Sequence, residues 1–286
     1  MSVVLLTGAT GFVGRAIHRY LQRRGHDVRV TVRPGTAPRL AVPTPQTAII
    51  ETDDIFARDA AWWAKACAGV DAVIHAAWFV EHGRYLNAPE NADCVQGSFA
   101  LVQGAVEAGV AHVIGLGTCM EYRLPGENLC VDAPLEPANF YAACKVATSH
   151  MMREWLAQHD TRFSWCRLFY LHGEDEHPAR IGAYLHRQLQ AGKQADLSAG
   201  TQVRDFLDVR QAGAMIANVV DSGQTGVINI CSGEPLTVRA FAERIADSYG
   251  RRDLLKFGGQ PPRPSDPAAV VGVCNLEKSA ELLEFL

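Results

Sequence analysis

The chain has 286 residues, of which 48% are hydrophobic and 20% are charged, and this composition excludes wholesale disorder. The 27 Lys and Arg against 31 Asp and Glu give a net charge of −4, so neither a nucleic-acid partner nor an acidic membrane surface is expected. No apolar run approaches the roughly 20 residues that a membrane-spanning helix needs. The N-terminal segment also has no basic region of the kind that begins a signal peptide.

Apolar runs and amphipathic stretches alternate from the N-terminus. A short apolar run at 3–6 leads through a glycine-rich loop to a helical pattern that stops at Gly25, and residues 28–32 form a second apolar run. A strand, loop, helix and strand within about 30 residues make one βαβ unit. The alternation continues with strands predicted at 47–50, 72–75, 112–116 and 163–168 and with helices predicted at 59–68, 92–108 and 140–159.

This alternation predicts an α/β fold with a doubly wound parallel sheet, of the Rossmann type, covered by helices on both faces. Beyond His172 the pattern loosens, with one helix predicted at 180–191, one strand at 227–231 and a proline-rich loop at 258–267. We therefore predict a Rossmann domain over 1–170, with a return segment at about 205–232. A smaller, discontinuous C-terminal domain is predicted from 171–204 and 233–286.

The eight cysteines contain no C-x-x-C pair, and the ten histidines show no paired-ligand spacing, so no metal site is predicted. Free thiols spread through apolar segments favour core packing in a reducing compartment. We therefore expect a cytoplasmic protein.

Three glycines at a spacing of three, Gly8, Gly11 and Gly14, follow the first predicted strand. Glycine allows a sharp turn and a close approach of the backbone to a pyrophosphate, and the helix N-terminus offers free N–H groups to the anion. An ordinary tight turn is the alternative. The position between a strand and an amphipathic helix favours a dinucleotide-binding loop.

The end of the second strand indicates which dinucleotide binds. An Asp or Glu there would bind the ribose 2′-OH of NAD, whereas a nearby Arg accommodates the 2′-phosphate of NADP. Val32 occupies the expected acidic position and Arg33 follows it, which favours NADP(H). NAD(H) stays possible if Arg33 is only a solvated turn residue. Asp54 and Ile55 are expected beside the adenine, although Asp54 is nearly as well explained as an ordinary loop acid.

Tyr141 and Lys145 stand four residues apart in a predicted helix, so their side chains share one face. An ammonium close to a phenol favours the phenolate, so we expect Lys145 to lower the pKa of Tyr141 toward working pH, as a general acid/base requires. A solvated helix face is the alternative. Thr118, after the strand at 112–116, lies at the sheet edge where ligands bind and can donate a hydrogen bond to a developing alkoxide.

In this order, the glycine loop, Thr118, Tyr141 and Lys145 resemble the extended short-chain dehydrogenase/reductase family, and more narrowly its nucleotide-sugar epimerase/dehydratase/ketoreductase branch. The resemblance covers nearly the whole chain. It implies that Tyr141 and Lys145 are catalytic together with Thr118, that both also contact the cofactor, and that Thr118 contacts the substrate. Further cofactor contacts are implied at Thr10, Phe12, Val13, Ala76, Ala77 and Phe169.

The resemblance also implies a substrate site in the smaller domain. Residues 202–206 and 263–266 are similar to two diphosphate-binding elements of the family, which implies that Arg204 and Arg263 bind the nucleotide diphosphate. Cys119 and Tyr170 are implied as further substrate contacts. Trp78, His82, Tyr85 and Arg180 are pocket candidates by position alone.

Departures from the family pattern restrict the reactions that we expect this protein to catalyse. In sugar 4,6-dehydratases the catalytic Thr is followed by Asp and Glu, whereas Cys119 and Met120 follow Thr118 here, which argues against dehydration. Cys94 stands where the family commonly has an Asn, and Gln211 replaces the Asp that follows the R-D-F element.

We therefore expect an NADP(H)-dependent reductase of a keto group on a nucleotide-activated sugar, with an NDP-4-keto-6-deoxyhexose as the favoured substrate. A nucleotide-sugar epimerase that retains its cofactor is the main alternative, and a non-catalytic NADP(H) sensor is a third. The resemblance implies a homodimer.

Overall fold

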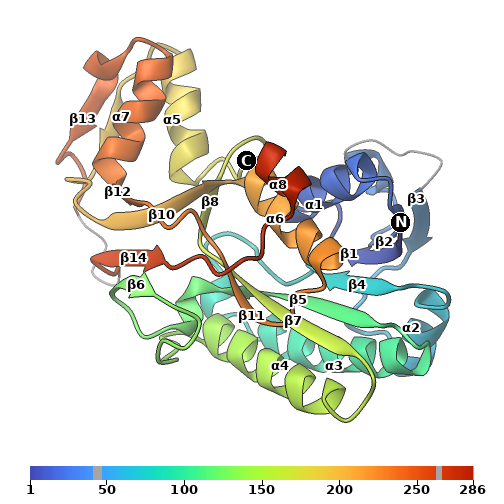
Figure 1. Ribbon diagram of the computed structural model, residues 1–286. Helices are drawn as coiled ribbons and strands as arrows, with labels where there is room; N and C mark the ends of the chain where they lie inside the picture. Colours follow the sequence, from blue (N-terminus) through green and yellow to red (C-terminus); the bar gives the residue numbers. More distant parts are fainter. Residues whose placement is uncertain (41–46, 262–265, 286) are drawn as a thin grey trace.

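The computed structural model describes residues 1–40, 47–261 and 266–285, and its main feature is a seven-stranded sheet with the order β11-β7-β5-β4-β1-β2-β3 (Figure 1). Every pairing in this sheet is parallel. The strands are β1 (Val3–Thr7), β2 (Asp27–Val32), β3 (Thr47–Glu51), β4 (Ala72–His75), β5 (His112–Thr118), β7 (Arg162–Leu168) and β11 (Gly226–Ile230). The predicted α/β fold with a doubly wound parallel sheet is confirmed.

Helices cover both faces of this sheet, as Figure 1 shows. One face carries α1 (Phe12–Arg23), α6 (Val209–Ser222) and the short α8 (Ala280–Phe285); the other carries α2 (Ala60–Ala66), α3 (Glu90–Glu107) and α4 (Phe140–Leu156). Because side chains alternate along a strand, Val4 and Leu6 of β1 join the core under α1 and α6, while Leu5 joins the core under α2, α3 and α4.

A smaller unit stands at one edge of the large sheet. Its five-stranded sheet contains β12 (Pro235–Thr237), β10 (Val203–Asp208), β14 (Ala269–Gly272) and β6 (Gly126–Leu129) in that order, and β8 (Tyr170–His172) also pairs with β10. A separate apolar cluster joins α5 (Ile181–Gln190) and α7 (Val238–Ser248) to the strand pair β9 (Ala195–Leu197) and β13 (Leu255–Phe257). Short 3-10 helices occur at Ala37–Arg39, Tyr85–Asn87, Cys119–Glu121 and Arg252–Leu254.

The chain passes between the two sheets several times. Strand β6 lies within the predicted 1–170 segment but pairs with β14 in the smaller sheet, and β10 crosses the predicted boundary between residues 204 and 205. The assignment of cofactor binding to one part of the chain and substrate binding to the other stays a prediction.

The large sheet brings four strand ends to one edge. Strands β1, β4, β5 and β7 all run in the same direction and end at Thr7, His75, Thr118 and Leu168. Strand β8 begins two residues after β7, so the smaller unit starts where the candidate residues gather. Within the described residues, no helix is both long enough and apolar enough to cross a bilayer.

Candidate active site

The glycine loop between β1 and α1 packs too closely for larger residues. Gly8 has a φ of +72°, and a Cβ atom there would lie 2.8 Å from the Ala77 nitrogen. A Cβ atom on Gly14 would collide with the Gly8 carbonyl oxygen. The first turn of α1 therefore lies against the end of β1, and the loop leaves a backbone-lined cradle that side chains do not fill.

The N-terminus of α1 is open toward this cradle. Gly11 is the N-cap and supplies no side-chain hydrogen bond, and the first turn contains no acidic residue. The first N–H groups of a helix have no intrahelical acceptor, and the helix dipole places partial positive charge there. A pyrophosphate suits these donors, so the residues present fit a dinucleotide cofactor.

The residues predicted to select NADP(H) and to lie beside the adenine of the cofactor follow the ends of β2 and β3. Val32 is buried at the end of β2, and Arg33 after it is exposed, with no carboxylate at this strand end. Asp54 accepts a hydrogen bond from the Phe56 nitrogen at 2.9 Å, and Ile55 packs against the core under α2 and α3. Their roles toward the cofactor stay predictions.

A buried hydrogen-bonded chain that sequence reasoning missed links β1, β4 and α3. The His75 ring contacts Thr7 Oγ1 at 2.9 Å through Nδ1 and Ser98 Oγ at 2.8 Å through Nε2. Thr7 Oγ1 also accepts from the Ala77 nitrogen at 3.1 Å. Burial, and after it the charge of Lys145, lowers the pKa of His75 to about 3, so the ring is neutral. The chain fixes the Ala77 backbone against the glycine loop.

Thr118, Tyr141 and Lys145 come together at the carboxyl end of β5, and all three are buried. Asn139 caps α4 by accepting from the Ala142 nitrogen, which places Tyr141 and Lys145 in the first two turns. Thr118 neighbours Tyr141 closely enough for its hydroxyl to favour the phenolate. The predicted triad is therefore adjacent in space.

Lys145 differs from the sequence prediction in its electrostatic role. Its Nζ donates to the Leu116 carbonyl oxygen at 2.7 Å and lies 3.7 Å from the centroid of the Trp78 ring. Burial lowers the pKa of Lys145 to about 7, while the charge of Glu121 acts in the opposite direction. Burial also raises the pKa of Tyr141, so the predicted lowering by Lys145 is wrong. Desolvation outweighs the ammonium, which faces the carbonyl and the indole.

Two aromatic rings pack against the ring of Tyr141. The Tyr85 ring lies edge-to-face at 5.0 Å between centroids, and the Trp78 ring lies at 6.5 Å. Trp78 is fixed because its Nε1 donates to Asn91 Oδ1 at 2.8 Å. Asn91 is fully buried in α3, and no sequence signal singled it out. Cys94 stands at the position where the family commonly has an Asn, and its sulfur accepts a hydrogen bond from the Phe79 nitrogen.

Arg204 is buried on β10 and faces Tyr170. Its Nη2 pairs with Asp266 Oδ1 at 2.5 Å, its Nη1 donates to the Val203 carbonyl oxygen at 2.7 Å, and its Cζ lies 5.0 Å from the Tyr170 ring centroid. Arg263, its predicted companion, lies outside the described residues. These contacts hold the planar guanidinium in one orientation, and its role toward a diphosphate stays a prediction.

Two other predicted contacts are buried near this Arg. Burial raises the pKa of the Cys119 thiol to about 12, so the group is a neutral thiol rather than an acid. Phe169, between β7 and β8, packs with Cys119 in the apolar cluster of the smaller sheet.

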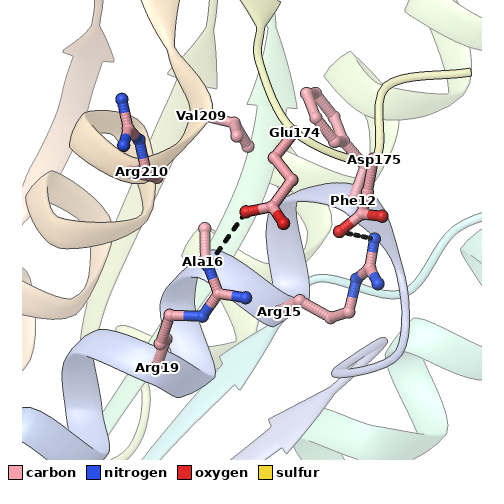
Figure 2. A pocket seen from close by; sticks show the side chains of 8 residues that line it. All are labelled: Phe12, Arg15, Ala16, Arg19, Glu174, Asp175, Val209 and Arg210. Atoms are coloured by element: carbon pink, nitrogen blue, oxygen red, sulfur yellow. Dashed lines mark ion pairs between the residues drawn. The ribbon is translucent and has the colours of Figure 1, made fainter. Parts of the chain in front are cut away.

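Ion pairs hold the segment after β8 against α1 (Figure 2). Arg15 contacts Asp175 at 2.6 Å and Arg19 contacts Glu174 at 3.6 Å. The notch between them has about 10 Å³ of free volume, which suits one water molecule and no organic ligand. These pairs place Arg180, in the same segment, with its Cζ 6.0 Å from the Phe12 ring centroid.

No group of three or more His, Cys, Asp and Glu side chains that could hold a metal ion occurs in the described part of the chain.

The fold and the cradle define a dinucleotide-binding enzyme of the Rossmann class. The family model described as the NAD-dependent epimerase/dehydratase family matches residues 4–231, and the chain belongs to this family. The expected resemblance to the extended short-chain dehydrogenases/reductases, and the expectation of an oxidoreductase-type enzyme, are confirmed.

Curated relatives match along most of the chain. A dTDP-6-deoxy-L-talose 4-dehydrogenase (NAD(+)) from Aggregatibacter actinomycetemcomitans is 23% identical over 94% of this chain and 98% of the relative. A UDP-glucose 4-epimerase from Streptomyces lividans is 26% identical over 93% and 86%.

Solved structures agree in fold. A UDP-N-acetylglucosamine 4-epimerase from Methanobrevibacter ruminantium M1 superposes with a TM-score of 0.85 at 20% identity, covering 96% of this chain and 90% of that one. The Streptomyces venezuelae dTDP-glucose 4,6-dehydratase DesIV, with NAD bound, gives 0.81 at 24% identity, covering 98% and 93%.

Proposed function

We propose that this protein is an NADP(H)-dependent reductase of a keto group on a nucleotide-activated sugar, with an NDP-4-keto-6-deoxyhexose as the favoured substrate. One observation carries the proposal: a buried, protonated Tyr141 lies beside Thr118 and Lys145 at the sheet edge that also holds the glycine cradle. A protonated phenol is the form that can give a proton to the alkoxide made when a carbonyl is reduced.

When bound, a reduced nicotinamide cofactor would supply the hydride that the keto carbon accepts. Thr118 donates a hydrogen bond to the keto oxygen and steadies its developing charge. Tyr141 then transfers its phenolic proton to that oxygen. Lys145 binds the cofactor ribose, and its pKa of about 7 allows it to pass a proton back to Tyr141 near neutral pH.

A nucleoside diphosphate group on the substrate is supported by Arg204 and by the relatives. The talose dehydrogenase and the glucose epimerase are named for nucleotide sugars. The pre-oriented guanidinium of Arg204 beside Tyr170 suits a diphosphate, with exchange of Asp266 for the phosphate oxygens. Arg263 completes this site in the proposal.

Reduction is favoured over dehydration because the two positions after Thr118 carry no acid. Cys119 is a buried thiol with a raised pKa, and Met120 cannot transfer a proton. Elimination of water needs an acid and a base at these positions, so the site supports hydride and proton transfer only.

An epimerase is the second candidate, and the UDP-glucose 4-epimerases among the relatives favour it. An epimerase returns the hydride to the opposite face of the sugar, so its cofactor is regenerated and stays bound on purification. A non-catalytic sensor is less well supported because Thr118, Tyr141 and Lys145 are all retained.

The choice of NADP(H) rests on Arg33 and on the absence of an acid at the end of β2. The NAD named for the talose dehydrogenase and for DesIV keeps NAD(H) as the alternative. We further infer a cytoplasmic homodimer. The cytoplasmic location is supported by eight free cysteines, and the dimer rests on the family resemblance.

Absorbance of NADPH over time, with purified protein and a panel of NDP-4-keto-6-deoxysugars, tests the proposal. We expect stoichiometric loss of NADPH with at least one sugar. Interconversion of 4-hydroxy NDP-hexoses with oxidised cofactor, without net cofactor change, identifies an epimerase, and no change in either assay rejects both enzyme functions for these substrates.

A further inference from the structure

A carboxylate three residues after Thr118 is buried without contact with water. Glu121 has an exposed fraction of 0%, and three side-chain or backbone groups donate to it. The Thr118 nitrogen donates to Oε1 at 2.8 Å, the Trp165 indole nitrogen lies 3.1 Å from both oxygens, and Arg167 Nε donates to Oε2 at 2.7 Å. Every donor belongs to β5 or β7, so the carboxylate points toward the large sheet.

Glu121 and Thr118 form a reciprocal capping box at the 3-10 helix Cys119–Glu121. Thr118 Oγ1 accepts from the Met120 nitrogen at 3.3 Å, and Glu121 accepts from the Thr118 nitrogen. Because Oγ1 is occupied as an acceptor, its hydroxyl proton is free to point toward Tyr141 and a bound carbonyl. The box thus fixes the position of Thr118 and leaves its hydroxyl proton available as a donor.

The carboxylate also contributes charge to the proton-transfer groups. Lys145 is faced by Glu121, by Cys94 of α3, by the neutral His75 of β4 and by Tyr141 of its own helix. Glu121 raises the pKa of both Lys145 and Tyr141, which favours their protonated forms.

The guanidinium of Arg167 forms a buried ion pair with the Glu121 carboxylate. The same guanidinium packs on the Tyr122 ring, with Cζ 4.5 Å from the ring centroid. The charge of Glu121 therefore has a partner that keeps it in the interior.

We propose that Glu121 is a positioning residue for the proposed reductase site, which fixes Thr118 through the capping box and holds a buried negative charge on the Tyr141–Lys145 side of the sheet edge. The inference rests on the proposed function for its reaction and extends it to a carboxylate that does not touch the substrate. It also explains how an acidic side chain can lie in this segment of a site that supports no dehydration.

The test compares Glu121→Gln with Glu154→Gln, a control whose side chain is 71% exposed on α4. Turnover of the keto sugar that consumes NADPH, and the dissociation constant of NADPH, are measured from pH 5.5 to 9 for each variant. For Glu121→Gln we expect kcat to fall about 10-fold or more with KM changed by less than about three-fold. We also expect the basic limb of the kcat profile to move roughly 0.5 to 1 pH unit toward acid.

A binding measurement keeps this test separate from the test of the reaction. Because Lys145 lies where the cofactor ribose is expected, we expect the NADPH dissociation constant to rise as Lys145 loses its proton, and to do so at lower pH in Glu121→Gln. If the wild-type protein reduces no sugar, the proposed reaction fails, and this binding transition alone decides the role of Glu121.

Folding is controlled with the double variant Glu121→Gln/Arg167→Gln, which leaves no unpaired buried guanidinium. Thermal unfolding and circular dichroism show which variant is folded, and the pH measurements are made on that one. A pH transition unmoved from that of Glu154→Gln, in a folded variant, overturns the proposal, since loss of stability alone lowers the amount of active protein without moving its pH dependence.

Discussion

Tyr141 is the residue on which the proposed reaction depends most directly. For Tyr141→Phe we expect kcat to fall roughly 10²- to 10⁴-fold, because the phenyl ring has no proton to give to the alkoxide. The NADPH dissociation constant, measured by fluorescence titration, is expected to change by less than about three-fold. Tyr249→Phe, at the end of α7, serves as the control with unchanged turnover. Near-normal turnover of Tyr141→Phe with cofactor bound would exclude this Tyr as the acid.

In the proposed function, Arg33 is the residue that selects NADP(H) over NAD(H). For Arg33→Ala we expect NADPH binding to weaken about 10-fold or more, because a charge-assisted contact with the 2′-phosphate is lost. NADH binding is expected to stay unchanged, and so is NADPH binding in Arg39→Ala, a nearby exposed Arg. Equal weakening of NADPH and NADH in Arg33→Ala would contradict a 2′-phosphate contact.

The residues of the candidate site differ in how well the sequence predicted them. Tyr141 and Lys145 could be predicted because a spacing of four on a helix is a local pattern. The direction of the Tyr141 pKa could not, because it depends on burial that the assembled protein creates. His75 was missed because its partner Thr7 lies 68 residues away on another strand. The Thr118-x-x-Glu121 capping box is a local pattern, but the burial of Glu121 depends on Trp165 and Arg167 of β7.

At the scale of elements, the turn from β1 into α1 has no room for side chains at Gly8 and Gly14. For Gly14→Ala we expect the dinucleotide dissociation constant to rise about 10-fold or more and the stability to fall by roughly 1–3 kcal/mol, because the new Cβ atom collides with the Gly8 carbonyl. Both are measured by fluorescence titration and urea unfolding.

Gly25 is the matched control for that substitution. It has a φ of +79° with open space around it, so Gly25→Ala is expected to lose about 1 kcal/mol of stability from backbone strain and no affinity. Normal dinucleotide binding by Gly14→Ala would show that the cradle tolerates a side chain and does not fit as closely as described.

The strands of the large sheet were predicted well and those of the smaller unit were not. Strands β1, β4 and β5 are mostly apolar runs buried on both faces, which is a strong local signal. Strands β8, β9, β12 and β13 have three residues each, and their pairing partners lie far away in the chain. Such strands are stabilised by tertiary contacts, so no window of sequence indicates them.

At the scale of the whole molecule, buried histidines couple stability to pH. Burial lowers the pKa of His18 and His112 to about 4 and that of His75 to about 3, below the ordinary value near 6.5. The unfolded chain therefore binds protons first as pH falls, and stability is lost from about pH 6.5 downward. At pH 5 we expect a loss of about 2 kcal/mol for each fully buried His.

Urea unfolding between pH 7.5 and 5 measures this loss, and a variant assigns it. His112 is buried beside Ser164, outside the candidate site, so His112→Gln should flatten the pH dependence, whereas the exposed His159→Gln should not. A pH dependence equal in both variants would mean that His112 does not titrate on unfolding as described.

Net hydride transfer is the central claim, and isotope labelling tests it most directly. The protein is incubated with NADPH carrying deuterium at the transferable C4 position and with the NDP-4-keto-6-deoxysugar that consumes it. Mass spectrometry of the product then locates the label. We predict one deuterium per product molecule, at the carbon that held the keto group, with equimolar oxidised cofactor. Product formed without deuterium, with the label retained on the cofactor, would contradict the reductase.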